Sequence, residues 1–190
     1  MEITYSIGEE NGMNKEQIER CLNTYGEDVY RFCCFLTGSR DLAEDLYQDC
    51  FLKAMELERC VEDTSMKNFV IGIAANLWKN RWRKEKRRRK VVSTVELDAE
   101  YMYKAAFNDS TDADNPQEAY IREETVQIVS QAVNALPEKY RIILLMYYSV
   151  DMTTEKIAEE LGLSKGTVTS RLKRARDKVR KNLEDNGYER

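Results

Sequence analysis

Apolar side chains recur every three or four positions along the first part of the chain, and no segment alternates with period two. This spacing puts them on one face of an α-helix. We therefore expect three helices, from Asn14 to Leu36, from Asp41 to about Glu58, and from Ser65 into a basic run. Their inward positions are Ile18, Leu22, Tyr25, Val29, Phe32 and Cys33, then Leu42, Leu46, Cys50, Ala54 and Leu57, then Phe69, Val70, Ile73, Ala74 and Leu77.

The residues between these helices are of the types that end or begin a helix. Thr37-Gly38-Ser39 interrupts the apolar period after the first helix. Asp41 is positioned to cap the second helix, with Glu44 reaching back to it three residues later. Thr64 and Ser65 offer the cap of the third helix.

The period is lost in residues 91–116, which mix acidic residues with Ser, Thr and Asn, although 96–107 could form a short helix. This composition is typical of a linker. Helical spacing returns over 117–136, and Pro137 opens a further helix at a position where its missing N–H costs nothing. The buried side of that helix is expected to be Ile142, Ile143, Leu145 and Met146.

The sharpest local signal follows. Thr153 can cap a short helix, Gly162 can supply the left-handed residue of a tight turn, and Ser164 can cap a longer helix. Inward positions of the two helices are Ile157, Ala158 and Leu161, then Val168, Leu172, Ala175 and Val179. Two helices joined in this way form a helix-turn-helix, whose second helix enters a DNA major groove. A helical hairpin with a solvated basic face is the alternative.

The pattern as a whole predicts an all-α protein of two small helical domains joined by an acidic linker. The expected divisions are an N-terminal extension 1–13, a first helical domain 14–90, the linker 91–116, a helix-turn-helix domain 117–184 and a tail 185–190. Both domains are large enough to bury a core. No apolar run approaches the roughly 18 residues of a membrane-spanning helix, and residues 1–13 lack the features of a secretory signal. We therefore expect a cytoplasmic protein with no integral membrane segment.

The net charge of −4 hides a segregation of charge into blocks. One basic block spans 79–90 and the other spans 165–181, with an acidic stretch between them. A lysine-arginine run is often only a solvated helix face, but two such runs with few compensating acids favour a polyanionic partner. Trp78 and Trp82 lie by the first block, where an aromatic ring could stack on an unpaired base. Their spacing also suits two core residues on one face.

Five cysteines and the absence of histidine limit the chemistry of the chain. The cysteines are Cys21, Cys33, Cys34, Cys50 and Cys60, an odd number without a C-x-x-C motif, so we expect reduced structural thiols and no metal site. Redox sensing through Cys33-Cys34 or Cys60 remains an alternative. Without histidine the commonest general base is missing. We expect no cofactor and no enzymatic activity, with a carboxylate-based enzyme as the weakest alternative.

Three strings of residues resemble the sigma factors of bacterial RNA polymerase. Residues 43–52, AEDLYQDCFL, are similar to the conserved-region-two helix that docks on the clamp helices of the largest polymerase subunit. Residues 136–141 (LPEKYR), 156–162 (KIAEELG) and 166–176 (GTVTSRLKRAR) are similar to region four. Because only regions two and four are present, the chain resembles the extracytoplasmic-function (ECF) group, and the resemblance covers nearly the whole chain.

The resemblance implies a specificity subunit that binds core polymerase at its clamp and flap. This subunit would bind promoter DNA, open the duplex and initiate transcription. The resemblance also implies control by an anti-sigma factor. The implied polymerase-binding residues are Asp45, Gln48, Asp49, Phe51 and Leu52. Those implied at the −10 element, with the loop 59–65 holding a flipped base, are Asn76, Trp78, Lys79, Asn80, Arg81, Trp82 and Arg83. Those expected to read the −35 element as duplex are Lys165, Thr167, Thr169, Ser170, Arg171 and Arg174.

Three positions depart from the family's usual pattern, namely Phe69 for tryptophan, Ala75 for arginine and Asp151 for glycine. The absence of an arginine at position 75 makes the promoter sequence unpredictable from the chain. A stand-alone helix-turn-helix regulator, whose first helices merely dimerise or sense a signal, is the rival hypothesis. It would bind duplex DNA tightly without polymerase.

Overall fold

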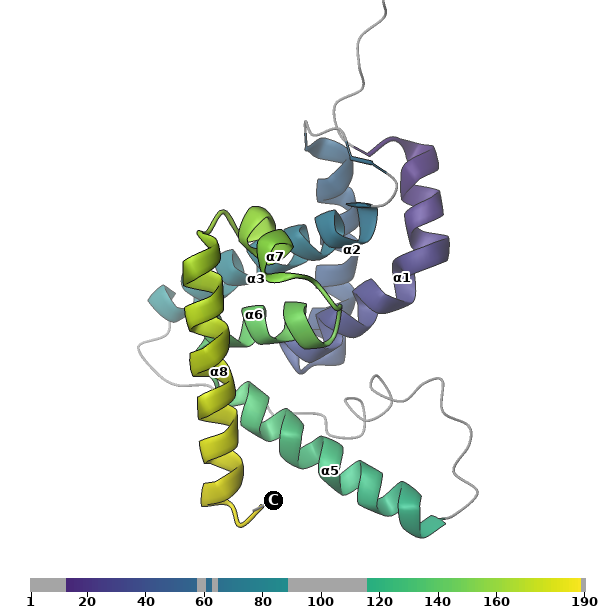
Figure 1. Cartoon of the computed structure of the whole chain (residues 1–190). Coiled ribbons are helices and arrows are strands. Elements are labelled where there is room, and N and C mark those ends of the chain that lie inside the picture. Colours follow the sequence, from purple (N-terminus) through teal and green to yellow (C-terminus); the bar gives the residue numbers. More distant parts are fainter. Residues whose placement is uncertain (1–12, 58–60, 63–64, 89–115, 189–190) are drawn as a thin grey trace, which may run out of the picture.

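The computed structural model describes residues 13–57, 61–62, 65–88 and 116–188. These ranges contain helices and no strand, which confirms the all-α prediction. The helices are α1 (Lys15–Thr37), α2 (Arg40–Glu56), α3 (Met66–Arg88), α5 (Pro116–Asn134), α6 (Glu138–Tyr148), α7 (Thr154–Leu161) and α8 (Lys165–Asp185). Helices α1, α2 and α3 pack on one another, and α5, α6 and α7 gather with α8 (Figure 1). No helix among the described residues is long and apolar enough to cross a membrane.

Helix α1 begins and ends with the local signals expected from the sequence. Asn14 Oδ1 accepts the backbone N–H of Gln17 at 2.8 Å, and Gln17 Oε1 accepts the N–H of Asn14 at 3.2 Å, which forms a capping box. Gly38 ends the helix in the left-handed conformation, with φ 68°, and donates its N–H to Cys34 O.

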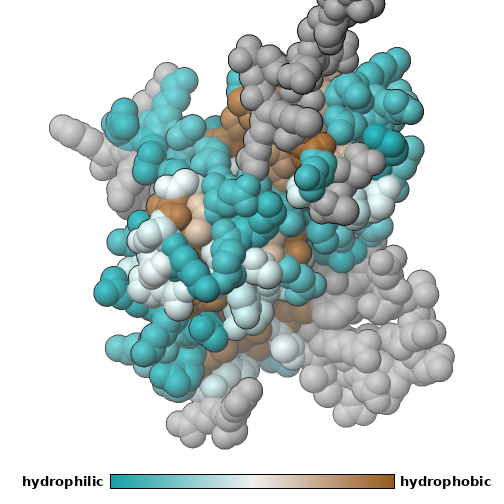
Figure 2. All heavy atoms as spheres, turned by 45° about the horizontal axis from the view of Figure 1, so that its top comes forward, coloured by the Kyte–Doolittle hydropathy of each residue, from teal (hydrophilic) through white to brown (hydrophobic). Residues whose placement is uncertain are grey.

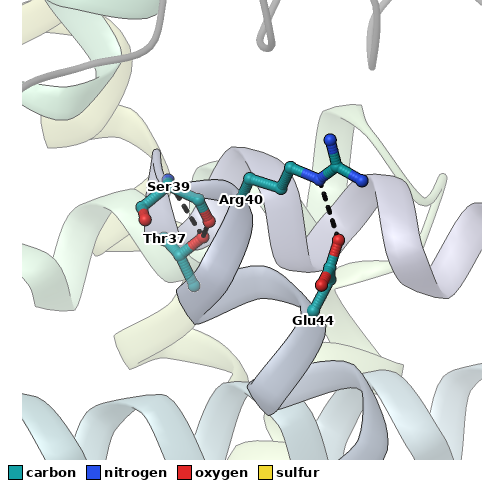
Figure 3. Close-up of polar contacts among 4 residues, drawn as sticks. All are labelled: Thr37, Ser39, Arg40 and Glu44. Carbon is teal, nitrogen blue, oxygen red and sulfur yellow. Dashed lines mark hydrogen bonds and ion pairs between the residues drawn. The ribbon is translucent and has the colours of Figure 1, made fainter.

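The start of α2 differs from the prediction. The helix begins at Arg40, its N-cap residue is Ser39, and Asp41 lies inside the first turn rather than at the cap. Figure 3 shows the turn: Thr37 Oγ1 accepts the N–H of Ser39, and Arg40 Nε donates to Glu44 Oε1 at 2.9 Å. Because left-handed Gly38 turns the chain within two residues, α2 starts before Asp41. Glu44 therefore accepts a hydrogen bond from Arg40 and does not form the predicted capping interaction with Asp41.

Helix α3 is buried on more sides than one apolar stripe requires. The predicted inward residues Phe69, Val70 and Ala74 are buried, but so are Ile71 and Ala75, which lie off that stripe. A helix that is apolar all round is packed on all sides. Helices α1 and α2 pack against α3 from the first domain, and α6 and α7 contact it from the second.

Helix α6 is the corresponding buried helix of the second domain. Every residue from Tyr140 to Met146 is buried, including the guanidinium-bearing Arg141. Arg141 Nη1 donates to Asn134 Oδ1 at 3.1 Å and so joins α6 to the end of α5. Burial lowers the pKa of Arg141, while the nearby Glu138 carboxylate favours its charged form. Arg141 of the LPEKYR string therefore has a structural role.

Parts of the sequence prediction lie outside the described residues. They are most of the N-terminal extension, the possible helix 96–107, nearly all of the linker, and Cys60 with most of the loop 59–65.

Candidate nucleic-acid and polymerase interfaces

The helix-turn-helix is formed by α7 and α8, as predicted. Thr153 Oγ1 accepts the backbone N–H of Lys156 at 3.3 Å, and Ser164 Oγ accepts that of Thr167 at 3.2 Å. Gly162, with φ 61°, supplies the left-handed residue between the helices. These caps satisfy backbone donors at both helix starts, so the start of each helix is stabilised by residues a few positions away.

Helix α8 has one buried face and one exposed face. Val168, Leu172 and Ala175 are buried, and Val179 is half-buried. Of the predicted DNA contacts, four are exposed and two, Thr167 and Arg171, are half-buried; the exposed ones are Lys165, Thr169, Ser170 and Arg174. The structure thus brings the six together at the start of α8, where hydroxyl and cationic donors can reach base edges and phosphates.

Two of these cations are held by neighbouring side chains. Lys165 Nζ forms an ion pair with Glu155 at the start of α7. The Lys165 ammonium group also donates a hydrogen bond to the Glu155 carboxylate, and this lowers the pKa of Glu155 from 4.5 to about 2. Arg174 hydrogen-bonds the Tyr140 hydroxyl of α6, which lowers the pKa of that tyrosine. Lys165 and Arg174 are therefore oriented by the helices that α8 packs against.

The turn before α7 contains the departure from the family pattern at position 151. Asp151 has φ 57° and is the one non-glycine residue with positive φ among the described residues. Left-handed backbone is strained for residues with a Cβ, and aspartate tolerates it better than most. The usual glycine at this position is thus explained by backbone geometry.

The basic end of α3 offers a second exposed cationic surface. Asn80, Trp82 and Arg83 are exposed, with Trp82 38% accessible. Lys79 and Arg81 are half-buried. These side chains combine cations with an aromatic ring, the combination that holds single-stranded nucleic acid.

Trp78 and Asn76 do not join that surface. Trp78 is 6% exposed and lies in the core, the alternative that its spacing also allowed, and its stacking on a base stays a prediction. Although the two tryptophans are four positions apart, Trp78 is the last buried residue of α3 among those whose burial is described, and Trp82 is exposed. Asn76 donates to Gly72 O and to Glu160 O, both at 3.0 Å, and is therefore occupied within the protein.

Helix α2 carries the predicted polymerase-binding motif on an exposed stripe. Asp45 and Gln48 are exposed, and Leu52 is 55% exposed although it is apolar. Phe51 does not share this surface: it is 6% exposed and packs edge-on against Tyr47, with ring centroids 5.1 Å apart. Phe51 therefore lies in the core of this structure, one position before the exposed Leu52, and its contact with polymerase stays a prediction.

One exposed residue on this stripe was missed. Met55 follows Leu52 by three positions, so the two share a helix face, and Met55 is 44% exposed. The available signal was its i+3 spacing from Leu52. Asp45, Gln48, Leu52 and Met55, here called the α2 stripe, combine polar groups with an exposed apolar pair of the kind that marks an interaction site.

Asp49 lies beside this stripe and joins it to the basic end of α3. The Asp49 carboxylate forms an ion pair with Arg81. Asp49, a predicted polymerase contact, therefore interacts with Arg81, a predicted −10 contact. Both side chains remain partly exposed, 47% and 36%. A partly exposed pair of this kind is easily exchanged for another partner.

The described cysteines are buried free thiols. Cys21, Cys33 and Cys50 lie close together in the first domain, and Cys33 hydrogen-bonds Cys50. Burial raises the pKa of Cys21 to about 11. A buried thiol with a raised pKa has little reactive thiolate, which favours the structural interpretation over redox sensing at Cys33-Cys34. The described residues contain no cluster of ligands suited to a metal ion.

Hydrophilic residues cover most of the described surface on the face shown in Figure 2, with smaller hydrophobic areas between them.

The fold and its two cationic surfaces define a helical DNA-binding protein with a helix-turn-helix in its second domain.

Comparison with known proteins narrows this class. The family models "Sigma-70 region 2" and "Sigma-70, region 4" match residues 21–88 and 127–179. The ECF RNA polymerase sigma factor SigW of Bacillus subtilis is 28% identical over 86% of this chain and 87% of its own length. The RNA polymerase sigma-H factor of Pseudomonas aeruginosa is 30% identical over 75% of this chain and 73% of its own.

A solved structure has the same fold. It is the sigma factor RpoE from Bartonella quintana in complex with the anti-sigma factor NepR, matched with a TM-score of 0.62 and 22% identity over 89% of this chain and 98% of that chain. The chain belongs to the ECF group of sigma-70 RNA polymerase sigma factors. It is thus an alternative sigma factor that acts in promoter recognition and transcription initiation, and not a member of an enzyme family.

Proposed function

We propose that the α2 stripe docks this chain on the clamp of the largest subunit of core RNA polymerase. The support is the exposure of Asp45, Gln48 and Leu52 on a helix whose other faces are buried in the first domain. An exposed apolar pair ringed by polar groups is a typical anchor of a protein interface. Asp49 borders the stripe and contributes through the same surface.

The basic end of α3 then holds the −10 element as it opens. Trp82 supplies a stacking face, and Arg81 and Arg83 supply cations for the phosphates. Lys79 and Asn80 extend this surface, and Asn76 joins it when its present partner is released. Opening at an unstacked base needs both a π-face and phosphate contacts, and this helix end carries both.

Helix α8 reads the −35 element as duplex. Thr169, Ser170 and Arg174 present donors from one exposed face, and Lys165, Thr167 and Arg171 flank them. Arginine pairs with guanine edges in the major groove, and the hydroxyl groups reach either bases or phosphates. The observation that carries the proposal is this exposed face on a correctly capped helix-turn-helix.

The partners follow from the proposed role. Besides core polymerase, contacted at the clamp and the flap, and promoter DNA, we expect a cognate anti-sigma factor, because the Bartonella RpoE structure contains one. The protein acts in the cytoplasm, where polymerase is found, and has no catalytic activity or cofactor of its own.

A pair of variants tests the two interfaces separately. Asp45→Arg should weaken binding to purified core polymerase by about tenfold or more, because it puts a cation on the docking stripe.

Arg171→Ala combined with Arg174→Ala should leave core binding intact but abolish −35 protection in holoenzyme footprints, a loss of at least about tenfold in site affinity. Arg180→Ala is the matched control, since Arg180 pairs with Asp177 and Glu184 within α8. Undiminished footprints from the double variant would contradict the assignment of α8.

A further inference from the structure

The start of helix α1 is tied to the connection between α2 and α3. These segments meet at one end of the first domain (Figure 1). Gln17 Nε2, in the first turn of α1, donates to the backbone O of Val61 at 3.0 Å, across 44 positions of sequence. Val61 belongs to the 59–65 loop and is only 5% exposed. Of that loop the structure describes positions 61, 62 and 65, so this bond fixes a described part of it.

Backbone hydrogen bonds hold the chain on either side of this contact. The Met13 N–H donates to Ala54 O near the end of α2 at 3.2 Å, and the Met13 side chain is buried. The Ser65 N–H donates to Glu62 O at 2.8 Å, where the chain enters α3. Val61 lies between these two points, and a side chain fixes its carbonyl. A substitution at position 17 can therefore release Val61 while both backbone bonds remain.

The Gln17 amide uses its two polar atoms for two different tasks. Its Oε1 accepts the N–H of Asn14 and completes the capping box of α1, whereas its Nε2 bonds the loop. Glutamate completes a capping box equally well, because the box needs only an acceptor from this side chain. A carboxylate has no N–H to donate at pH 7. The loop, and not the helix, therefore requires an amide at position 17.

The anchored loop is the part of the first domain that we expect to hold a flipped base. A base that leaves the stack loses stacking and pairing free energy, which the site that receives it must offset. A site whose backbone is already fixed loses less conformational entropy on binding than one that becomes ordered at that moment. A fixed Val61 therefore favours base capture.

We propose that Gln17 is a positioning residue for promoter opening, whose amide holds Val61 so that the 59–65 loop receives the flipped base of the −10 element. Gln17 acts through Val61 and needs no contact with DNA in this role. The inference rests on the promoter-reading function proposed above. It adds a residue of α1, a helix to which the resemblance assigns no DNA contact.

The substitution Gln17→Glu separates the two tasks of this side chain. Its carboxylate keeps the acceptor for Asn14 and adds a negative charge at the start of α1, where such a charge is favourable. The donor to Val61 is lost, which leaves a buried carbonyl without this partner. Asn14→Ala is the converse variant, because it removes the acceptor of the Gln17 N–H and keeps the Nε2 bond. Asn23→Asp is the matched control, an amide-to-carboxylate change at an exposed position of the same helix.

The measurements use holoenzyme on a promoter that the wild-type protein opens, at a temperature where every variant is folded. Permanganate reactivity of unpaired thymines near −10 reports opening, and nuclease protection reports binding at −35. A titration with core polymerase and a thermal melt of the free protein complete the set. Promoters with each −10 base replaced in turn then give the base preference at each position.

For Gln17→Glu we expect opening to fall by roughly three- to tenfold, the range of one lost hydrogen bond. Base preference should shrink at the flipped position and stay unchanged at the others. Core binding, −35 protection and the melting temperature should remain at wild-type values. Asn14→Ala should melt a few degrees lower yet open the promoter like wild type. Asn23→Asp should match wild type in every measurement.

Wild-type opening and base preference in Gln17→Glu would overturn the proposal. A loss of opening shared equally by Asn14→Ala, or a loss of preference spread evenly over all −10 positions, would overturn it too, because either result indicates general destabilisation. Failure of the promoter-reading function has a different signature, since wild type itself would then give no core-dependent transcription.

Discussion

The two helices proposed to touch DNA, α3 and α8, differ in how freely their side chains are presented. Helix α8 keeps four of its six predicted contacts exposed, although Lys165 and Arg174 interact with Glu155 and Tyr140, and its caps and turn are all local. Helix α3 lies at the centre of the molecule, and four of its predicted contacts are engaged inside the protein: Trp78 in the core, Asn76 on α7, Lys79 on Asn76 and Arg81 on Asp49. The proposed −35 surface is thus largely exposed in this structure, whereas much of the proposed −10 surface is engaged within the protein.

The two tryptophans of α3 give the largest contrast. Trp78→Ala should lower the free energy of unfolding by about 3–5 kcal/mol, because it removes a large core side chain. Trp82→Ala should change the free energy of unfolding by less than about 1 kcal/mol. The same substitution should weaken binding of a single-stranded −10 oligonucleotide by roughly 1–3 kcal/mol. Denaturant melts and fluorescence anisotropy measure the two effects. Equal destabilisation by both substitutions would contradict the separation of a core and a surface tryptophan.

Neighbouring residues of α2 give a second contrast. Phe51→Ala should lower the free energy of unfolding by about 3–4 kcal/mol through a cavity beside Tyr47. Leu52→Ala should cost less than about 1 kcal/mol of stability but weaken binding to core polymerase by about tenfold. The check is a pair of urea melts with a core-binding titration. Wild-type core affinity for Leu52→Ala would remove Leu52 from the α2 stripe.

A smaller effect is expected at the left-handed residue before α7. Asp151→Gly should raise the free energy of unfolding by up to about 1 kcal/mol, because glycine relieves the strain at φ 57°. Asp151→Val should lower it by about 1–2 kcal/mol, since a β-branched residue tolerates this conformation poorly. A valine variant as stable as wild type would mean that the turn relaxes freely.

The smallest effect is a pH dependence at the start of the helix-turn-helix. The Glu155 carboxylate has a pKa lowered from 4.5 to about 2 by Lys165, so its contribution to stability is present above pH 4.5. That contribution is lost as the pH falls from 4.5 towards 2. The melting temperature of Glu155→Gln should therefore be lower than that of wild type at pH 7. This difference in melting temperature should shrink as the pH falls from 4.5 towards 2. A difference that stays constant down to pH 2 would contradict the effect of this ion pair.

Local signals in the sequence predicted most of the helices correctly. Gly38, Thr153, Gly162 and Ser164 act through hydrogen bonds to residues a few positions away, so their roles are readable without the fold. The error at Asp41 arose because the two-residue turn after α1 leaves room for one more residue of helix at the start of α2.

Contacts between distant segments could not be predicted in this way. The bond from Asn76 to Glu160 joins residues 84 positions apart, and nothing in the helical period indicates it. The uninterrupted apolar run of residues 69–75 was the available sign that α3 is buried on several sides. The burial of Phe51 and Trp78 was not foreseen from the resemblance for the same reason, since a resemblance names positions but not the direction in which each side chain points.

The central claim is that this chain directs RNA polymerase to specific promoters. The most direct test is run-off transcription with purified bacterial core polymerase and a library of promoter fragments, with and without the protein. The account predicts defined transcripts that appear only when the protein is added, and the active fragments would then identify the −10 and −35 sequences. No added transcript, together with tight binding of the isolated protein to duplex DNA, would contradict the account and favour a stand-alone regulator.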